Sequence, residues 1–557
     1  MIKNLTKYWA VWVLVIFIAS VSWPLSLPGY FSHHDDLQIM RIFEMRRCLI
    51  DAQIPCRWVP DMGYGNGFPL FNYYSALPYY IGAVLSFLLG YIWSAKVLFF
   101  IPLILGGFSM YLLGKELFGK IAGIVSAVLY LFAPYLALDL YVRGAVAESF
   151  ALSIVPLVFY FILRLIKQSS FKNFAGLSVS FAAFLISHNI MTLFFAPIIF
   201  LWTLCFSYSE KLKRIWLVFI GLILGFGMAA FFILPAFFEK SLVQSDSLIQ
   251  MDLNFRANFV AINQLFLERF WGYGASTFGS NDTISFQIGW PHWWLMALSI
   301  PFLIIGIFTR KLKLNQILLP VFLIVIFCFS VFMTHNQSAF IWEKIDVLKY
   351  AQFPWRFLSL AVFTSSLIGG FFVFVLRNKG QQVILASVII FITVFLNWSY
   401  FKPDKFYLSM TDQEKLTGSL WEDQQKAAIT DYLPKTALEP REKAPNSPLL
   451  VSGKAEISSF ANYSNKWFFK TNVIETSKID IPVFDFPNWQ VSVNGSDYPH
   501  NHQNLIGRIN IDLPPGSYEV SGNFKNTQLR TFADTLSLIS LGLLILFSYG
   551  KFKKIFI

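Results

Sequence analysis

Charge is scarce in this sequence. Asp, Glu, Lys and Arg make up only 14% of its 557 residues, whereas 56% are hydrophobic and 18% are aromatic. A soluble globule of this size requires a larger charged surface. The deficit excludes a soluble protein, and the many long apolar runs indicate instead a polytopic α-helical membrane protein surrounded by membrane lipids.

Cysteine and the short motifs of several enzyme classes are also scarce or missing. Four cysteines are too few for a disulfide framework, and Cys205 and Cys328 lie inside apolar runs. Cys48 and Cys56 lie in the same polar loop, and the sequence does not decide whether they form one disulfide or remain two free thiols. The sequence has no phosphate-binding loop ending in Lys-Ser/Thr, no Gly-x-Ser-x-Gly, no Cys-x-x-Cys and no His-Glu-x-x-His.

The chain carries a net charge of +12, but its basic residues are not arranged as in a nucleic-acid-binding protein. They form short clusters between apolar runs rather than a stripe interleaved with base-stacking aromatics. We therefore expect no nucleic acid as a partner, and we interpret the clusters as signals of membrane topology.

The first apolar run, Tyr8 to Leu27, follows Lys3 and Lys7 and has no small-residue cleavage site. It is typical of a retained signal anchor with a cytoplasmic N-terminus. Further runs of roughly spanning length lie at residues 97–114, 119–138, 147–163, 174–191, 192–207, 215–237, 291–309, 315–333, 358–376, 382–400 and 533–549.

Six basic clusters fall at alternate gaps between these runs, and the positive-inside rule places all six on the cytoplasmic face of the plasma membrane. They are Lys115 with Lys120, Arg164 with Lys167 and Lys172, Lys211 with Lys213 and Arg214, Arg310 with Lys311 and Lys313, Arg377 with Lys379, and Lys551 with Lys553 and Lys554. This agreement is the main topological signal in the sequence.

The segment from Leu77 to Trp93 is apolar enough to span, but a crossing here conflicts with that topology. With the N-terminus inside, it would move every basic cluster to the outer face. Either the segment lies along the interface or returns to the same side, or it crosses and the N-terminus is external. Aromatic residues at both of its ends favour the interfacial interpretation, which leaves about twelve crossings.

The chain divides into three parts on this topology. Residues 1–400 form a transmembrane domain whose first external loop is 29–76, and residues 531–557 form a final helix with a basic cytoplasmic tail. Residues 401–530 are polar and contain short segments of alternating pattern, which predict an extracytoplasmic β-sandwich domain.

Two turn signals and one tryptophan stand out in the β-rich part. Asn494-Gly495 and Pro514-Pro515-Gly516 predict hairpin turns. Trp489 lies in an alternating strand, where it can either stack on an acceptor glycan or point into the core and brace the domain.

Four polar residues, His33-His34-Asp35-Asp36, directly follow the first predicted span. A carboxylate at the external surface can take the proton from an acceptor hydroxyl or amine, and two carboxylates can hold a divalent metal. A solvated loop explains the same residues without chemistry. Zinc binding by His33 and His34 is disfavoured, because adjacent ligands on one strand rarely converge.

Further charged or titratable residues lie at predicted membrane boundaries. Arg143 and Glu148 can grip and orient a phosphate, or form an ion pair with each other or with Asp139. His188 ends an apolar run, either as an interfacial residue or as an acid or base. Arg356 opens a span beside a tryptophan, where it can hold a lipid phosphate or snorkel to the surface.

Several segments together match a known group of proteins. They are His34-Asp35, Trp58 to Gly65, Pro69 to Tyr74, Ala133 to Tyr135, Tyr141 to Glu148, Ser187 to Asn189 and Phe353 to Arg356. Through them, residues 1 to about 400 resemble bacterial membrane proteins catalogued as 6-pyruvoyl-tetrahydropterin-synthase-related. Those proteins in turn resemble the GT-C superfamily of polyprenyl-phosphate-sugar-dependent glycosyltransferases, including the YfhO-like group, whose C-terminal β domain is similar to the segment from Phe486 to Gly495.

The resemblance implies roles for individual residues. Asp35 would be the general base, with Asp36 as a second candidate, and Glu148 would be the acidic residue of the second external loop. Arg143 and Arg356 would hold the donor phosphate. The further residues expected to contact substrate are His34, Tyr64, Asn72 and His188. Superfamily members with single-sugar lipid donors are thought to work without metal, so the sequence leaves open whether this protein needs a divalent metal.

Two hypotheses of function result. The first is an inverting transfer of a sugar from a polyprenyl-phosphate donor to an envelope acceptor, which is a glycan, a glycolipid or a protein. The second is a lipid-linked-sugar transporter or a non-catalytic membrane scaffold, in which the same charges line a pathway. Convergence of Asp35, Glu148 and Arg356 in one external cavity favours transfer, whereas a continuous polar channel favours transport.

Overall fold

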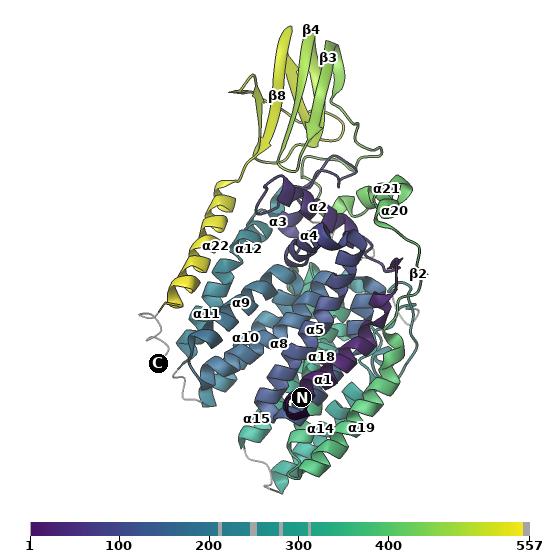
Figure 1. Cartoon of the computed structure of the whole chain (residues 1–557), viewed down its shortest axis with the longest axis vertical. Helices are drawn as coiled ribbons and strands as arrows, with labels where there is room; N and C mark the ends of the chain where they lie inside the picture. Colours follow the sequence, from purple (N-terminus) through teal and green to yellow (C-terminus); the bar gives the residue numbers. More distant parts are fainter. Residues whose placement is uncertain (1, 210–213, 245–252, 278–281, 310–313, 550–557) are drawn as a thin grey trace.

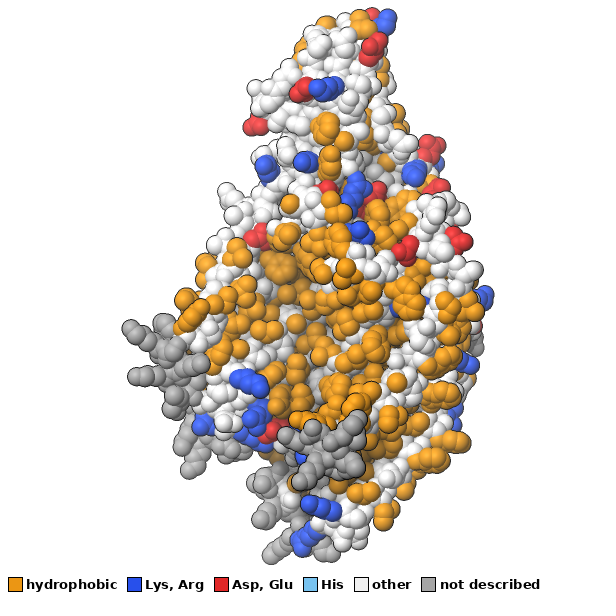
Figure 2. Space-filling model, in the orientation of Figure 1, with side chains coloured by type: hydrophobic (Ala, Val, Ile, Leu, Met, Phe, Trp, Pro, Cys, Tyr) orange, Lys and Arg blue, Asp and Glu red, His pale blue; other side chains and the backbone are white. Residues whose placement is uncertain are grey.

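The computed structural model of the chain describes residues 2–209, 214–244, 253–277, 282–309 and 314–549. Helices form an elongated bundle, and a β-rich domain projects from one end of it (Figure 1). Hydrophobic side chains cover the middle of the visible face, whereas charged side chains gather toward the two ends of the molecule (Figure 2). This distribution is that of a protein that crosses a membrane.

Nine helices among the described residues are long and apolar enough to cross a bilayer. They are α1 (Ile2–Ser22), α5 (Tyr91–Phe118), α8 (Val146–Lys167), α10 (Asn189–Ser209), α14 (Trp290–Phe308), α15 (Leu314–Thr334), α18 (Leu358–Phe374), α19 (Lys379–Asn397) and α22 (Gln528–Phe547). The prediction of a polytopic α-helical membrane protein is confirmed. The basic residues predicted at 211, 213, 310, 311, 313, 551, 553 and 554 lie outside the described part of the chain.

The predicted number of about twelve crossings is not confirmed for the described residues. Two broken spans, bent by 46° and 73°, raise the count to eleven at most. They are α6 (Lys120–Leu131) with Pro134–Arg143, and α11 (Ile215–Met228) with α12 (Ala230–Phe238). Pro134 explains the first break, because the residue before a proline avoids helical dihedrals and Ala133 is extended. The remaining predicted run forms α9 (Phe171–Ser187), whose 17 residues extend only about 26 Å.

Helix α4 (Leu77–Leu89) is the segment whose crossing the sequence left open. Its 13 residues extend about 20 Å, whereas the hydrocarbon core is roughly 30 Å thick, so α4 is too short to span. Gly90 follows with a φ of 74°, and α5 then begins at Tyr91, whose backbone N–H donates to a carboxylate oxygen of Asp412 at 2.7 Å. The length of α4 supports the interfacial interpretation.

The first loop, residues 29–76, is folded and largely buried. It contains α2 (Gln38–Ile50) and α3 (Leu70–Tyr73) and lies between the helices and the β domain (Figure 1). Arg41 and Glu44, one turn apart on α2, are almost completely buried. A disulfide joins Cys48 to Cys56, which resolves the pairing that the sequence left open.

The β-rich domain is present, and its strands are antiparallel. They are β3 (Leu449–Asn462), β4 (Lys466–Phe484), β5 (Trp489–Val493), β6 (Ser496–Asp497), β7 (Arg508–Leu513) and β8 (Gly516–Phe524). All belong to one hydrogen-bonded sheet in the order β3-β4-β8-β5-β6, with β7 on the second half of β4. The predicted sandwich thus has no separate second sheet among these six strands, because the 19-residue β4 continues the ladder through both halves.

The two predicted hairpin turns have different outcomes. Asn494 and Gly495, with φ of 48° and 79°, connect the paired strands β5 and β6, as a type I′ turn requires. The segment at Pro514 connects β7 to β8, but these strands each pair with β4 and, among the described residues, not with each other. The hairpin prediction is wrong at this second position.

The chain after residue 400 packs against the first loop. Strand β1 (Tyr30–Phe31) pairs with β2 (Phe406–Tyr407). The ring of Trp489 is buried and packs edge-to-face on the ring of Trp58 with a centroid distance of 5.5 Å. Of the two roles considered for Trp489, its burial favours bracing of the domain over stacking on a glycan.

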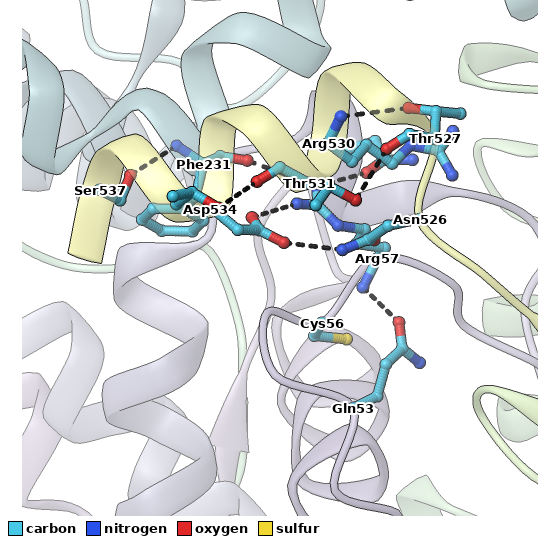
Figure 3. Close-up of polar contacts among 12 residues, drawn as sticks. Gln53, Cys56, Arg57, Phe231, Asn526, Thr527, Arg530, Thr531, Asp534 and Ser537 are labelled. Atoms are coloured by element: carbon cyan, nitrogen blue, oxygen red, sulfur yellow. Dashed lines mark hydrogen bonds and ion pairs between the residues drawn. The ribbon is translucent and has the colours of Figure 1, made fainter. Parts of the chain in front are cut away.

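Polar contacts anchor the last helix, α22, to the first loop and to the end of α12 (Figure 3). Arg57 Nη2 donates to Asp534 Oδ1 at 2.6 Å, which links the loop to α22. Arg530 Nε donates to Glu239 Oε2 at 2.7 Å, and both side chains are buried. Water therefore contributes little to the solvation of this second pair.

Loss of the pair between Arg530 and Glu239 should destabilise the protein. Arg530→Met leaves Glu239 as a buried charge without its cation, which costs roughly 3–5 kcal/mol in comparable cases. We expect a clear fall in the thermal unfolding midpoint in detergent. The control is Arg256→Met, because Arg256 and its partner Glu343 are 61% and 49% exposed, and such surface pairs contribute about 0–1 kcal/mol. Equal midpoints in the two variants would contradict this expectation.

Candidate active site

A cavity of about 450 Å³ lies where several loops and helix ends meet. Its walls come from the first loop, the turn that precedes α8, the start of α8, the junction of α9 with α10, and the turn that precedes α18. Six of the nine residues predicted for the site line this cavity: His34, Asp35, Arg143, Glu148, His188 and Arg356. The structure thus brings together groups that lie far apart in the sequence.

Two of the segments that carried the family resemblance lie side by side. The backbone N–H groups of His34 and Asp35 donate to the carbonyl oxygens of Val142 and Arg143, both at 2.9 Å. Gly144 follows with a φ of 70°, and a Cβ at this position would lie 2.5 Å from His33 Nδ1. Only glycine therefore allows the two segments to approach so closely.

Asp35 is anchored through one carboxylate oxygen. Its Oδ2 accepts hydrogen bonds from Arg41 Nη1 at 2.7 Å, from Gln38 Nε2 at 3.2 Å and from Tyr74 Oη at 3.4 Å. Its Oδ1 has no hydrogen-bond partner within the described ranges, and the side chain is 32% exposed. Asp35 therefore presents an oriented carboxylate with one oxygen available to a ligand.

Asp36 has different surroundings and does not line the cavity. Its Oδ2 accepts from Lys415 Nζ at 2.5 Å, and the lysine is almost completely buried. This pair ties the first loop to α20 (Asp412–Lys415). Of the two adjacent aspartates, only Asp35 lines the cavity.

Glu148, at the start of α8, joins two arginines. Its Oε2 accepts from Arg143 Nη1 at 3.0 Å and from Arg356 Nε at 3.2 Å, and its Oε1 accepts from Tyr135 Oη at 2.5 Å. Arg143 also forms an ion pair with Asp139. The ion pair considered from the sequence is therefore present, and both oxygens of Glu148 are occupied by protein groups.

The two arginines keep donors that the protein does not use. Arg356 Nη1 donates to the carbonyl oxygen of Ala351 at 2.9 Å, and the guanidinium of Arg143 lies 4.3 Å from the ring centre of Trp355. Neither Nη2 group has a hydrogen-bond partner among the residues that the structure describes. These oriented N–H groups suit an anion such as a phosphate.

Two histidines complete the wall of the cavity. His188 Nδ1 accepts from the backbone N–H of Met191 at 3.2 Å, and its ring is fixed at the start of α10. His34 Nε2 lies 2.9 Å from the carbonyl oxygen of Tyr273, to which it donates. Both rings are thus oriented by backbone contacts.

Tyr64 and Asn72 lie outside the cavity, unlike the other residues expected to contact substrate. Tyr64 Oη donates to Glu422 Oε1 at 2.5 Å, and Asn72 Oδ1 accepts from Arg57 Nη1 at 3.0 Å. These bonds connect the first loop to α21 (Gly418–Lys426) and stabilise the loop itself. Their sequence match reflects the fold of the loop rather than contact with this cavity.

Three charged or titratable residues of the cavity were not predicted from the sequence, namely Arg41, Tyr74 and Asp431. Arg41 lies six residues after Asp35, outside the i,i+3 and i,i+4 spacings at which charges pair on a helix, so the spacing gives no signal. Asp431 belongs to a polar stretch that offers no signal either.

The sequence left a divalent metal open as a possible cofactor. No group of three or more His, Cys, Asp or Glu side chains in the described ranges is arranged to hold a metal ion. The divalent metal considered from the sequence has no ligand set there.

The fold and the cavity define a multi-pass membrane protein with a charged, partly enclosed site at the ends of its helices. The model of one family matches residues 71–402, which is more than half of the chain. The chain belongs to this family, the membrane proteins with a 6-pyruvoyl-tetrahydropterin synthase related domain.

One relative in sequence is similar to part of the chain. An uncharacterized protein of Lactococcus lactis subsp. cremoris (strain MG1363) is 24% identical over 249 residues, which are 42% of this chain and 40% of the relative. The chain thus spans less than half the length of that relative.

The structural likenesses are distant. Arabinofuranosyltransferase AftD from mycobacteria aligns with a TM-score of 0.43 and 14% identity over 75% of this chain and 29% of AftD. The Archaeoglobus fulgidus oligosaccharyltransferase aligns with a TM-score of 0.41 and 14% identity over 72% of this chain and 56% of that protein. ArnT from Cupriavidus metallidurans, in a structure bound to undecaprenyl phosphate, aligns with a TM-score of 0.31 and 11% identity over 71% of this chain and 89% of ArnT. At these scores none of the alignments defines the site of this chain.

Glu148→Gln should destabilise the protein, because it removes the charge that holds two buried guanidinium groups. A broken buried pair costs roughly 3–5 kcal/mol, so the thermal unfolding midpoint should fall clearly. Glu116→Gln is the control, since Glu116 pairs with Arg164 and Lys167 at 3.3 and 3.2 Å in a more exposed setting. An equally small effect in both variants would show that Glu148 does not hold the cluster.

Proposed function

We propose that the protein is a membrane glycosyltransferase that moves a sugar from a polyprenyl-phosphate donor to an extracytoplasmic acceptor of the cell envelope. One observation carries this proposal. A carboxylate with a free oxygen and two guanidinium groups with free N–H donors converge in one cavity. Transfer from a lipid phosphate needs such a base and such anion-binding groups.

Arg143 and Arg356 hold the phosphate of the donor in this proposal. Their free Nη2 groups donate charge-assisted hydrogen bonds to its oxygens, and these bonds strengthen as the leaving phosphate gains charge. Glu148 is a positioning residue, because both of its oxygens already accept from side chains that it orients. This role differs from the direct acidic role that the sequence resemblance implied.

Asp35 acts as the general base. It takes the proton of the acceptor hydroxyl or amine while the acceptor atom forms a bond with the anomeric carbon of the sugar. The bond between that carbon and the phosphate oxygen breaks, and its electron pair leaves on the polyprenyl phosphate. Attack from the side opposite the leaving group inverts the anomeric configuration, and Asp35 then releases its proton to water.

The orientation proposed from the sequence has two supports. The first turn of helix α8 holds Glu148 at the cavity and its last turn holds Arg164 and Lys167, and its 22 residues extend about 33 Å, close to the thickness of a bilayer core. The basic cluster at Arg164 and Lys167 therefore lies about one membrane thickness away from the cavity. The disulfide of the first loop, on the side of the cavity, fits an oxidising exterior.

The alternative function considered from the sequence is a lipid-linked-sugar transporter or a scaffold. The packing between the membrane-spanning helices favours sugar transfer over transport. The rings of Phe159 and Phe363 lie 4.7 Å apart, and Phe159 also packs edge-to-face on Trp202 at 5.0 Å. All three are almost completely buried. Apolar side chains thus fill the bundle between α8, α10 and α18, where a pathway for a sugar head group would need polar groups.

Asp35→Asn tests the proposed base, because the amide keeps the shape of the side chain but cannot take a proton at neutral pH. We expect the transfer rate to fall by about 100-fold or more. The assay measures undecaprenyl phosphate released from a panel of undecaprenyl-phosphate sugars, with envelope membranes as acceptor. Undecaprenyl phosphate is the product whichever sugar is moved.

Asp404→Asn is the control for this experiment, because Asp404 is an exposed carboxylate of the same extramembrane region. It should keep the wild-type rate. A wild-type rate in Asp35→Asn would overturn the assignment of the base, and no release by the wild-type protein with any donor would overturn the proposed function.

A further inference from the structure

Asp431 belongs to a segment that sequence reasoning did not connect with the site. The segment follows α21 and contains the short turn η10 (Ile429–Asp431). Asp431 lines the cavity together with Asp35 and Arg41. It also lines a second cavity of about 390 Å³, which shares Tyr74, His188 and Arg356 with the first. Its carboxyl group therefore lies where the two spaces adjoin.

The backbone beside Asp431 is firmly held. Ala428 has a φ of 55°, a left-handed conformation that a residue other than glycine keeps only when its surroundings determine it. Ile429 and Leu433 are buried, and the ring of Tyr432 stacks on that of Tyr73 at 5.6 Å. Asp431 is thus presented to the cavity by an ordered turn.

The carboxylate of Asp431 lacks a protein partner. Asp35 and Asp36 pair with Arg41 and Lys415, whereas Asp431 has no side-chain hydrogen bond or ion pair within the described ranges. Half-buried carboxylates are normally paired, because loss of water is costly for a charged group. A carboxylate that is ordered, unpaired and directed into a cavity is suited to pair with a ligand.

We infer that Asp431 is an acceptor-binding residue, whose carboxylate accepts a hydrogen bond from a hydroxyl or ammonium group of the acceptor and positions the acceptor beside Asp35. This inference rests on the proposed glycosyl transfer. The ligand class follows from charge, since two neighbouring carboxylates repel a phosphate but attract O–H and N–H donors. The donor phosphate belongs at Arg143 and Arg356 for the same reason.

Acceptor binding should depend on pH through Asp431. Burial raises the pKa of Asp431 to about 6; the charge of Arg41 acts to lower it, and that of Asp35 to raise it. Besides Arg41 and Asp35, the charged or titratable groups that line one or both cavities are His34, Tyr73, Tyr74, Arg143, Glu148, His188, Lys240, Tyr350, Arg356 and Tyr432. Below about pH 6 the carboxyl group is protonated and uncharged, so acceptor binding weakens as the pH falls.

The experiment compares Asp431→Asn with wild type in the undecaprenyl phosphate release assay, with the donor saturating and the amount of envelope membranes varied. We expect the half-saturating amount of membranes to rise by about ten-fold or more, because hydrogen bonds to charged groups are strong. The donor KM should stay within about two-fold. In wild type, the half-saturating amount of membranes should rise as the pH falls below about 6, and this rise should be absent in Asp431→Asn.

Two controls separate positioning from folding. Asp423→Asn changes an exposed carboxylate of α21, the helix directly before this segment, and should behave as wild type. Binding of undecaprenyl phosphate to the purified protein should be unchanged in Asp431→Asn and weakened in Arg356→Ala, and Asp431→Glu should recover part of the acceptor affinity. An unchanged half-saturation in Asp431→Asn, or a loss of undecaprenyl phosphate binding equal to that of Arg356→Ala, would overturn this inference alone. No release by wild type would overturn the proposed function as well.

Discussion

One buried carboxylate shared by two arginines determines the geometry of the candidate site. Glu148 begins α8, Arg143 ends the turn before it, and Arg356 lies in the turn that precedes α18, so this cluster fixes three helix ends relative to one another. Burying three charges is costly, and the cluster is tolerated because opposite charges and the Tyr135 hydroxyl satisfy each other. The same arrangement leaves the Nη2 groups of both arginines available to an anion.

The cavity is completed by parts of the chain that do not cross the membrane. The first loop contributes Asp35, and its position depends on the buried cation of Arg41 and on backbone bonds to the segment before α8. The region after residue 400 contributes Asp431 and is tied to the first loop through Lys415 and Asp36. The extramembrane region therefore takes part in the site rather than only bracing the last helix.

Apolar periodicity and strand alternation predicted most elements of the fold, because both patterns are local. The break between α11 and α12 and the pairing of β7 depend on neighbouring elements and could not be read from local pattern, whereas the break at Ala133 follows from the local effect of Pro134. In the site, Asp35 and Asp36 are equivalent as a sequence pair and differ only through their tertiary partners, Arg41 and Lys415. Asp431 is one polar residue among many in its stretch, and only the packing of η10 brings it to the cavity.

The cavity combines two separate groups of charged side chains, and this separation supports a displacement reaction. Asp35 is bound to Arg41 of the first loop, whereas Arg143 and Arg356 are bound to Glu148, and no side-chain hydrogen bond joins the two groups among the described residues. An inverting transfer needs its base and its leaving-group donors on different sides of the reacting carbon. If Asp35 were paired with Arg143 or Arg356 instead, the base and the phosphate would compete for the same cation. The separate partner of each group removes this conflict in the proposed reaction, in which Arg41 orients the base while Arg143 and Arg356 hold the donor phosphate.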